Sequence, residues 1–64
     1  MNPALKKLIC NPNGINWNET TMQERIYLHE LVRIRWAEAT YDLNYGYIVT
    51  LTTSGYAEVF DTLL

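Results

Sequence analysis

The strongest constraint on the fold is a long helix-forming run that begins at a recognisable start signal. Thr21-Met22-Gln23-Glu24 has the spacing of a capping box, in which threonine and glutamate satisfy each other's backbone N–H groups. From Thr21 to Ala39 there is no glycine or proline, and Gln, Glu, Arg, Leu and Ala dominate. This run predicts a single long helix over about residues 21–40.

Apolar residues occur on two sides of this predicted helix. At about 100° per residue, they form two stripes: Leu28, Val32 and Ala39 in one, and Tyr27, Ile34 and Tyr41 in the other. A helix on the surface of a globular protein usually has one apolar stripe. We therefore expect neighbours on two sides of this helix, supplied by the chain, by a second copy or by a target.

Residues before this run permit two interpretations. Asn2 is a good helix cap, Pro3 suits the first helical position, and apolar residues at 5, 8 and 9 would share one helix face. Alternatively, the turn-forming sequence at residues 11–14 closes a hairpin between residues 8–10 and 15–17. We favour a helix because residues 4–7 are poor strand formers. Ile15 to Trp17 is predicted to be a short strand in either case.

The C-terminal third is rich in β-branched and aromatic residues. Residues 47–52 and 56–60 are predicted to be strands, joined through a three-residue loop that ends at Gly55. Asn44-Tyr45-Gly46 ends the helix or turns the chain, and alternation over residues 41–45 allows an extra strand there. The predicted fold class is α+β: one long helix packed on a small antiparallel sheet that contains the C-terminal hairpin, with the N-terminal segment covering one end.

The chain length favours a single domain that associates with another surface. Sixty-four residues lie close to the lower limit for independent folding, and association is a common way of stabilising such a domain. We therefore expect a homodimer whose self-contacts come from one side of the helix. The predicted self-association residues are Leu28, Val32 and Trp36.

Charge and tyrosine are distributed unevenly along the sequence. Residues 1–37 carry five basic and three acidic side chains, whereas residues 38–64 carry four acidic and no basic ones. Tyrosine provides a large contact area with few rotatable bonds, which suits protein interfaces. We therefore expect a non-enzymatic module that inhibits or regulates a larger protein by occupying its surface. Its predicted contacts are Tyr45, Tyr47, Tyr56, Glu58 and Asp61.

No residue pattern indicates catalysis, a cofactor or a metal site. His29 and Cys10 are the only histidine and thiol, and the carboxylates show no metal-ligand spacing. A short acidic chain of this kind is typical of accessory proteins of phages and mobile elements, which block host enzymes by contact. The sequence has neither a signal-peptide apolar region nor an apolar run long enough to cross a membrane, so we expect a cytoplasmic protein.

The alternative function is nucleic-acid binding by a basic helix face beside a hairpin wing. Arg25, His29 and Arg33 recur at steps of four residues. The predicted contacts with phosphate are Arg25, Arg33, Arg35, Lys6 and Lys7. A formal net charge of −2 makes this hypothesis the weaker one, because binding to phosphates normally needs a basic excess.

Overall fold

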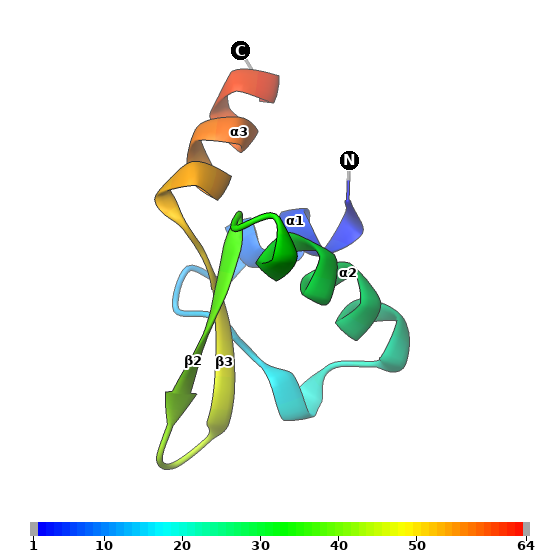
Figure 1. Cartoon of the computed structure of the whole chain (residues 1–64), viewed down its shortest axis with the longest axis vertical. Helices are drawn as coiled ribbons and strands as arrows, with labels where there is room; N and C mark the ends of the chain where they lie inside the picture. The colour runs from blue at the N-terminus through cyan, green and yellow to red at the C-terminus, as the bar shows by residue number, and fades with distance from the viewer. Residues whose placement is uncertain (1, 64) are drawn as a thin grey trace.

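The computed structural model describes residues 2–63 and has an α+β fold with three helices and a three-stranded antiparallel sheet (Figure 1). The elements in chain order are α1 (Pro3–Cys10), β1 (Ile15–Asn16), a 3₁₀ turn η1 (Trp17–Glu19), α2 (Met22–Arg33), β2 (Ala37–Asp42), β3 (Gly46–Leu51) and α3 (Thr53–Leu63). The strand order is β1-β3-β2. The α+β class is therefore confirmed, whereas two details of the predicted architecture are wrong.

The N-terminal segment is the helix α1. The Asn2 side chain accepts a hydrogen bond from the backbone N–H of Ala4 at 2.8 Å, and Pro3 occupies the first helical position. This capping confirms the helix and excludes the alternative hairpin through residues 8–10. The chain then turns at Gly14, whose φ of 106° and close approach to β3 leave no room for a side chain. The expected short strand is confirmed as β1, although Trp17 belongs to η1.

Helix α2 starts where the sequence predicts but ends early. The capping box is formed: the N–H of Glu24 donates to Thr21 Oγ1 at 3.1 Å, and the N–H of Thr21 donates to Glu24 Oε1 at 2.9 Å. The helix ends at Arg33, so a single helix over residues 21–40 is wrong. Tyr41 consequently lies on a strand, and the second predicted apolar stripe does not exist as a helix face.

The end of α2 is a Schellman motif with arginine in the position that glycine usually occupies. The N–H of Arg35 donates to the Val32 carbonyl at 3.1 Å, and the N–H of Trp36 donates to the Leu31 carbonyl at 2.9 Å. Arg35 has a φ of 67°, in the left-handed region. Without a glycine to mark the stop, the local sequence resembles a continuing helix. Pairing of the following residues with β3 outweighs that preference.

The hairpin of this fold is β2–β3, not the predicted pair of strands at residues 47–60. Ala37 pairs with Leu51, Ala39 with Val49 and Asp42 with Gly46. The Asp42 carboxylate accepts hydrogen bonds from the backbone N–H groups of Asn44 and Tyr45 at 2.7 and 3.1 Å, which fixes the turn. The turn signal at residues 44–46 is therefore used to reverse a strand.

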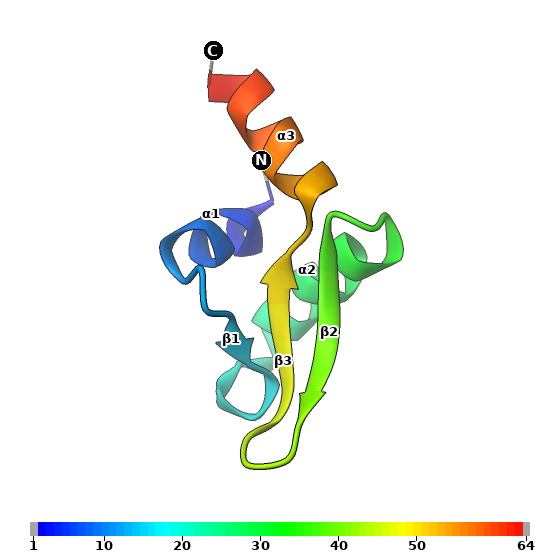
Figure 2. The same cartoon turned by 90° about the vertical axis from the view of Figure 1, so that its left-hand side faces the viewer.

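The second predicted strand of the C-terminal hairpin is instead the helix α3. Thr52 starts it by accepting the Gly55 N–H on its hydroxyl at 3.1 Å and the Tyr56 N–H on its carbonyl at 2.9 Å. Figures 1 and 2 show α3 extending away from the sheet, at the end of the molecule opposite the hairpin turn. Among residues 53–61 of α3, Gly55 and Val59 are buried.

The hydrophobic core lies between the sheet and the first two helices. Figure 1 shows α1 and α2 on the same side of the β2–β3 hairpin. The largest fully buried side chains are Leu8, Leu28, Leu31 and Val49. The alternation of β3 places Val49 and Leu51 on this buried face, as the sequence indicates. Within residues 2–63, no helix is long and apolar enough to span a bilayer.

Candidate functional site

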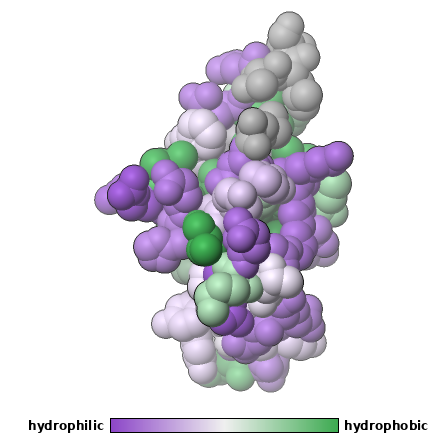
Figure 3. Space-filling model, turned by 90° about the vertical axis from the view of Figure 1, so that its right-hand side faces the viewer, coloured by the Kyte–Doolittle hydropathy of each residue, from purple (hydrophilic) through white to green (hydrophobic). Residues whose placement is uncertain are grey.

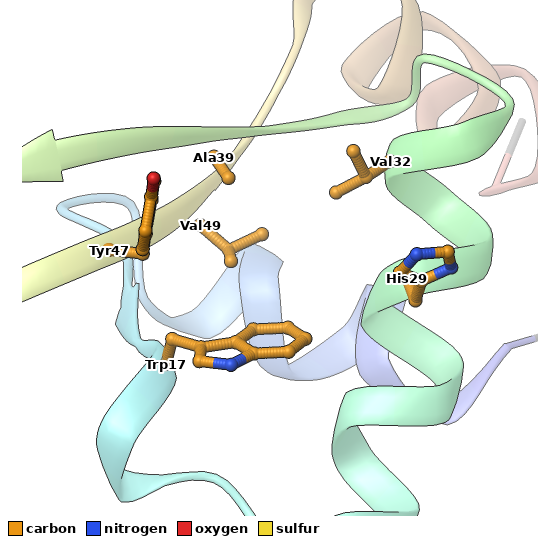
Figure 4. A pocket seen from close by; sticks show the side chains of 6 residues that line it. All are labelled: Trp17, His29, Val32, Ala39, Tyr47 and Val49. Atoms are coloured by element: carbon orange, nitrogen blue, oxygen red, sulfur yellow. The ribbon is translucent and has the colours of Figure 1, made fainter.

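A hollow of about 140 Å³ lies between α2 and the β2–β3 hairpin (Figure 4). Its lining is almost entirely apolar and consists of Trp17, His29, Val32, Ala39, Tyr47 and Val49. Figure 4 shows Trp17 across the hollow from Ala39, with Tyr47 on the hairpin side and His29 and Val32 on the helix side. Apolar concave sites of this kind are where proteins commonly accept a ligand or a side chain of a partner.

The hollow follows from strand register and helix periodicity. Tyr47 and Val49 are two residues apart on β3 and therefore project from the same face. Ala39 pairs with Val49, and its small side chain leaves unfilled the space that a larger residue would occupy. His29 and Val32 are three residues apart on α2 and share the helix face that borders this space.

A second depression continues from the hollow along α2. Trp17 and His29 belong to both, and Met22 and Ile26 extend the apolar surface toward the start of the helix. Met22 is 76% exposed and Ile26 is 59% exposed. Figure 3, which views the right-hand side of Figure 1, shows separate hydrophobic areas on a mainly hydrophilic surface. We call the hollow together with Met22 and Ile26 the α2–hairpin groove.

Arg25 holds Trp17 in place at the centre of this groove. Its guanidinium carbon lies 5.5 Å from the centre of the Trp17 ring, a cation–π arrangement. Its Nη2 donates to the Trp17 carbonyl at 3.2 Å and its Nε to Thr20 Oγ1 at 3.0 Å. The Thr20 hydroxyl in turn donates to the Trp17 carbonyl at 2.6 Å. Arg25 therefore orients an aromatic side chain of the groove.

The hairpin next to the groove exposes a group of aromatic and aliphatic side chains. Tyr41 and Tyr47 contact each other edge to face, with 5.3 Å between ring centroids. Leu43 and Tyr45, in or beside the turn, are both exposed. Figure 1 shows this turn projecting beyond the rest of the molecule. Large apolar groups at a projecting turn are available for contact with another surface.

The five residues predicted to contact a partner do not form one surface. Tyr45 and Tyr47 belong to the β2–β3 hairpin, whereas Tyr56, Glu58 and Asp61 lie on α3 at the opposite end of the molecule (Figure 1). Tyr56 is half-buried and stacks on Phe60, with ring centroids 6.4 Å apart. The structure separates them because residues 53–63 form a helix that leaves the sheet and not the second strand of a hairpin; their role as partner contacts stays a prediction.

The residues predicted for self-association also separate. Leu28 has no exposed surface, so it packs within the core and cannot contact a second copy. Val32 lines the hollow, and Trp36 is half-buried where α2 leads into β2. Leu28 and Val32 share a helix face as predicted; Leu28 belongs to the core of the same chain, and Val32 packs against that core.

The cations predicted to bind nucleic acid are dispersed. Lys7 forms an ion pair with Glu24, and Arg33 Nη2 lies 3.7 Å from Glu30 Oε1. The hydrogen bond from Lys7 and that from the Thr21 N–H lower the pKa of Glu24 from 4.5 to about 2. Arg25 turns toward Trp17. Lys6 is exposed on α1, and Arg35 is exposed in the Schellman motif.

Most residues of the groove were not predicted from the sequence to be functional. The sequence places His29 between Arg25 and Arg33 in a pattern of four-residue steps, and it predicts Trp17 to be a strand residue. The available signal was Met22 and Ile26, two apolar residues one helical turn apart beside a polar face. In residues 2–63, no group of three or more His, Cys, Asp or Glu side chains could hold a metal ion. Comparisons with protein-family models, curated proteins and solved structures find no match to this chain.

Proposed function

We propose that this protein is a small non-enzymatic binding module that inhibits or regulates a larger protein by occupying part of its surface. The contact would be made through the α2–hairpin groove. The observation that carries this proposal is the continuous apolar surface from Met22 and Ile26 through Trp17 to Tyr47. Such surfaces on small proteins commonly mark sites of protein association.

The composition of the groove suits the centre of a protein interface. Interface centres are enriched in Trp, Tyr and Met and depleted in charge. The groove contains Trp17, Met22 and Tyr47 around an apolar hollow that can accept one large side chain. Because Arg25 already fixes Trp17, little conformational freedom would be lost at that position on binding.

The charges near the groove define the kind of partner. Glu30 lines the depression along α2, whereas Glu38 and Asp42 alternate with Ala39 along β2 and project from the opposite face of the sheet. No lysine or arginine occurs from residue 38 onward. We therefore propose a partner surface with a protruding apolar side chain and, beside it, a basic residue that faces Glu30. Opposite charges of this kind accelerate encounter and fix orientation more than they add affinity.

Tyr47→Ala and Ile26→Ala test the groove, with Phe60→Ala as the matched control. Tyr47 and Phe60 are 54% and 58% exposed, and Phe60 lies on α3, far from the groove (Figure 1). Each tagged variant is used to capture partners from a native extract, and the affinity for the captured protein is then measured. Truncating an interface anchor costs about 1–3 kcal/mol, so both groove variants should bind roughly five- to 150-fold more weakly. Unchanged binding by both groove variants would refute the proposal.

Nucleic-acid binding is the competing outcome of the same experiment. Because Lys7, Arg25 and Arg33 already contact groups of the chain, the structure offers little support for a shared phosphate-binding face. We expect no retardation of random duplex DNA in a low-salt gel shift. Retardation that weakens steeply with added salt would favour the competing function.

A further inference from the structure

Strand β2 forms an open edge of the sheet. The strand order β1-β3-β2 leaves one side of β2 without a paired strand from residues 2–63. Proteins usually protect such edges with lysine, proline, bulges or a covering element. The sequence of β2, Ala37 to Asp42, contains no lysine, arginine, proline or glycine.

The backbone groups that face this open side can be assigned from the ladder. The N–H of Thr52 donates to the Trp36 carbonyl at 2.9 Å, which makes these two residues a hydrogen-bonded position. Hydrogen-bonded and non-hydrogen-bonded pairs alternate along an antiparallel ladder. In steps of two from Trp36, the residues whose backbone groups bond to β3 are Glu38, Thr40 and Asp42. The backbone groups of the intervening residues Ala37, Ala39 and Tyr41 therefore point away from β3.

Helix α2 extends beyond this edge of the sheet. Figure 2 shows its last turn and the following loop reaching past β2 in the layer behind the strands. Ile34 at this end of the helix is 42% exposed, and Tyr41 on β2 is 62% exposed. An added strand beside β2 would lie against this end of α2.

We propose that β2 pairs with β2 of a second copy, antiparallel and with Ala39 opposite the partner's Ala39. Three antiparallel registers centred near the middle of β2 allow the outward backbone groups of the two copies to form hydrogen bonds with each other. One places Glu38 opposite the partner's Glu38, and another places it opposite the partner's Asp42; both bring like charges together. The proposed register places Glu38 opposite the partner's Thr40.

The same register matches size and charge across the two-fold axis. Tyr41 faces the partner's Ala37, so a large side chain meets a small one, and the two alanines at the axis avoid a clash. Asp42 faces the partner's Trp36, whose chain neighbour is the exposed Arg35. Asp42 of each copy thus lies one residue across from the partner's Arg35, an opposite charge. This complementarity identifies a second copy as the occupant of the edge.

Disulfide formation tests the register directly, in a Cys10→Ser background that removes the native exposed thiol. Hydrogen-bonded partners have Cα atoms about 5.5 Å apart, which a disulfide can bridge. Ala39→Cys should therefore give a covalent dimer on oxidation. In the matched control Thr40→Cys, the two cysteines would be about 8 Å apart and should not be bridged. Absence of the Ala39→Cys dimer, or equal bridging by Thr40→Cys, would overturn the proposal.

Charge substitution at Thr40 gives an independent test in the otherwise native chain. Thr40→Lys places an opposite charge against the partner's Glu38 twice per dimer, and Thr40→Glu places a like charge there. The dimer dissociation constant, measured by sedimentation equilibrium, should fall roughly two- to thirtyfold with lysine and rise by a similar factor with glutamate. A monomeric wild type across the whole concentration series, or equal effects of both substitutions, would contradict the proposal.

Discussion

Gly55→Ala should destabilise the protein even though alanine is the better helix former. Gly55 lies in the first part of α3, where the helix approaches the start of β2. A Cβ atom there would lie 2.2 Å from the Trp36 carbonyl oxygen and 2.9 Å from Leu51 Cγ. The carbonyl belongs to the backbone and already accepts the Thr52 N–H, so no side-chain rotation relieves the contact.

The expected size of this effect follows from two opposing terms. Replacing glycine by alanine within a helix stabilises it by about 1 kcal/mol. Forcing a methyl group into a filled space usually costs about 1–3 kcal/mol. We take the upper value, about 3 kcal/mol, because the close contact here is with backbone. The net loss is then about 2 kcal/mol, equivalent to a fall in Tm of roughly 8–16 °C for a domain of this size.

Thermal and urea unfolding followed by circular dichroism would measure this loss. Ser54→Ala is the matched control, because Ser54 precedes Gly55 on the same helix and its side chain is exposed. It should leave Tm unchanged or raise it slightly. An equal or higher Tm for Gly55→Ala would show that the close approach of α3 to Trp36 is not maintained in solution.

Two further substitutions test the ends of α2. Arg35→Gly should raise the free energy of unfolding by up to about 1 kcal/mol, because glycine adopts the left-handed conformation without the cost that arginine bears. The control Arg35→Ala keeps that cost and should show no gain. Equal urea midpoints for the glycine and alanine variants would disprove this reasoning. Glu24→Gln keeps a capping side chain but removes the charge that pairs with Lys7. Because the pKa of Glu24 in the folded protein lies below its ordinary value of 4.5, the stabilisation by its charged carboxylate is fully present above pH 4.5. This stabilisation is lost as the pH falls toward about 2. The urea midpoints of wild type and Glu24→Gln should therefore converge over that interval, and a constant difference would contradict the assigned cause.

The candidate groove was only partly predictable because its members are distant in sequence. Tyr47 was singled out as an aromatic contact, and Val32 as a self-contact, but nothing in the sequence places them on two sides of one hollow. Ala39 contributes by being small opposite Val49, a property that exists only in the register of β2 with β3. Trp17 reaches the centre because Arg25 holds it there.

Local signals in the sequence determined where the chain starts helices and where it turns. Asn2-Pro3 and Thr21 with Glu24 start α1 and α2 through hydrogen bonds within a few residues, so their geometry needs no distant partner. The turn signals at residues 11–14 and 44–46 act over a similarly short range. The strand character of residues 47–51 follows from β-branched residues and alternation.

Tertiary structure alone decided the two segments whose local preference is ambiguous or opposed. Residues 37–39 are Ala-Glu-Ala, a helix-forming sequence, yet they form a strand because pairing with β3 buries Ala37 against the core. Residues 56–60 have strand-forming side chains, yet they lie in a helix that Thr52 caps and Val59 anchors to the core. In both segments, burial and long-range hydrogen bonds outweigh intrinsic preferences of a few tenths of a kcal/mol per residue.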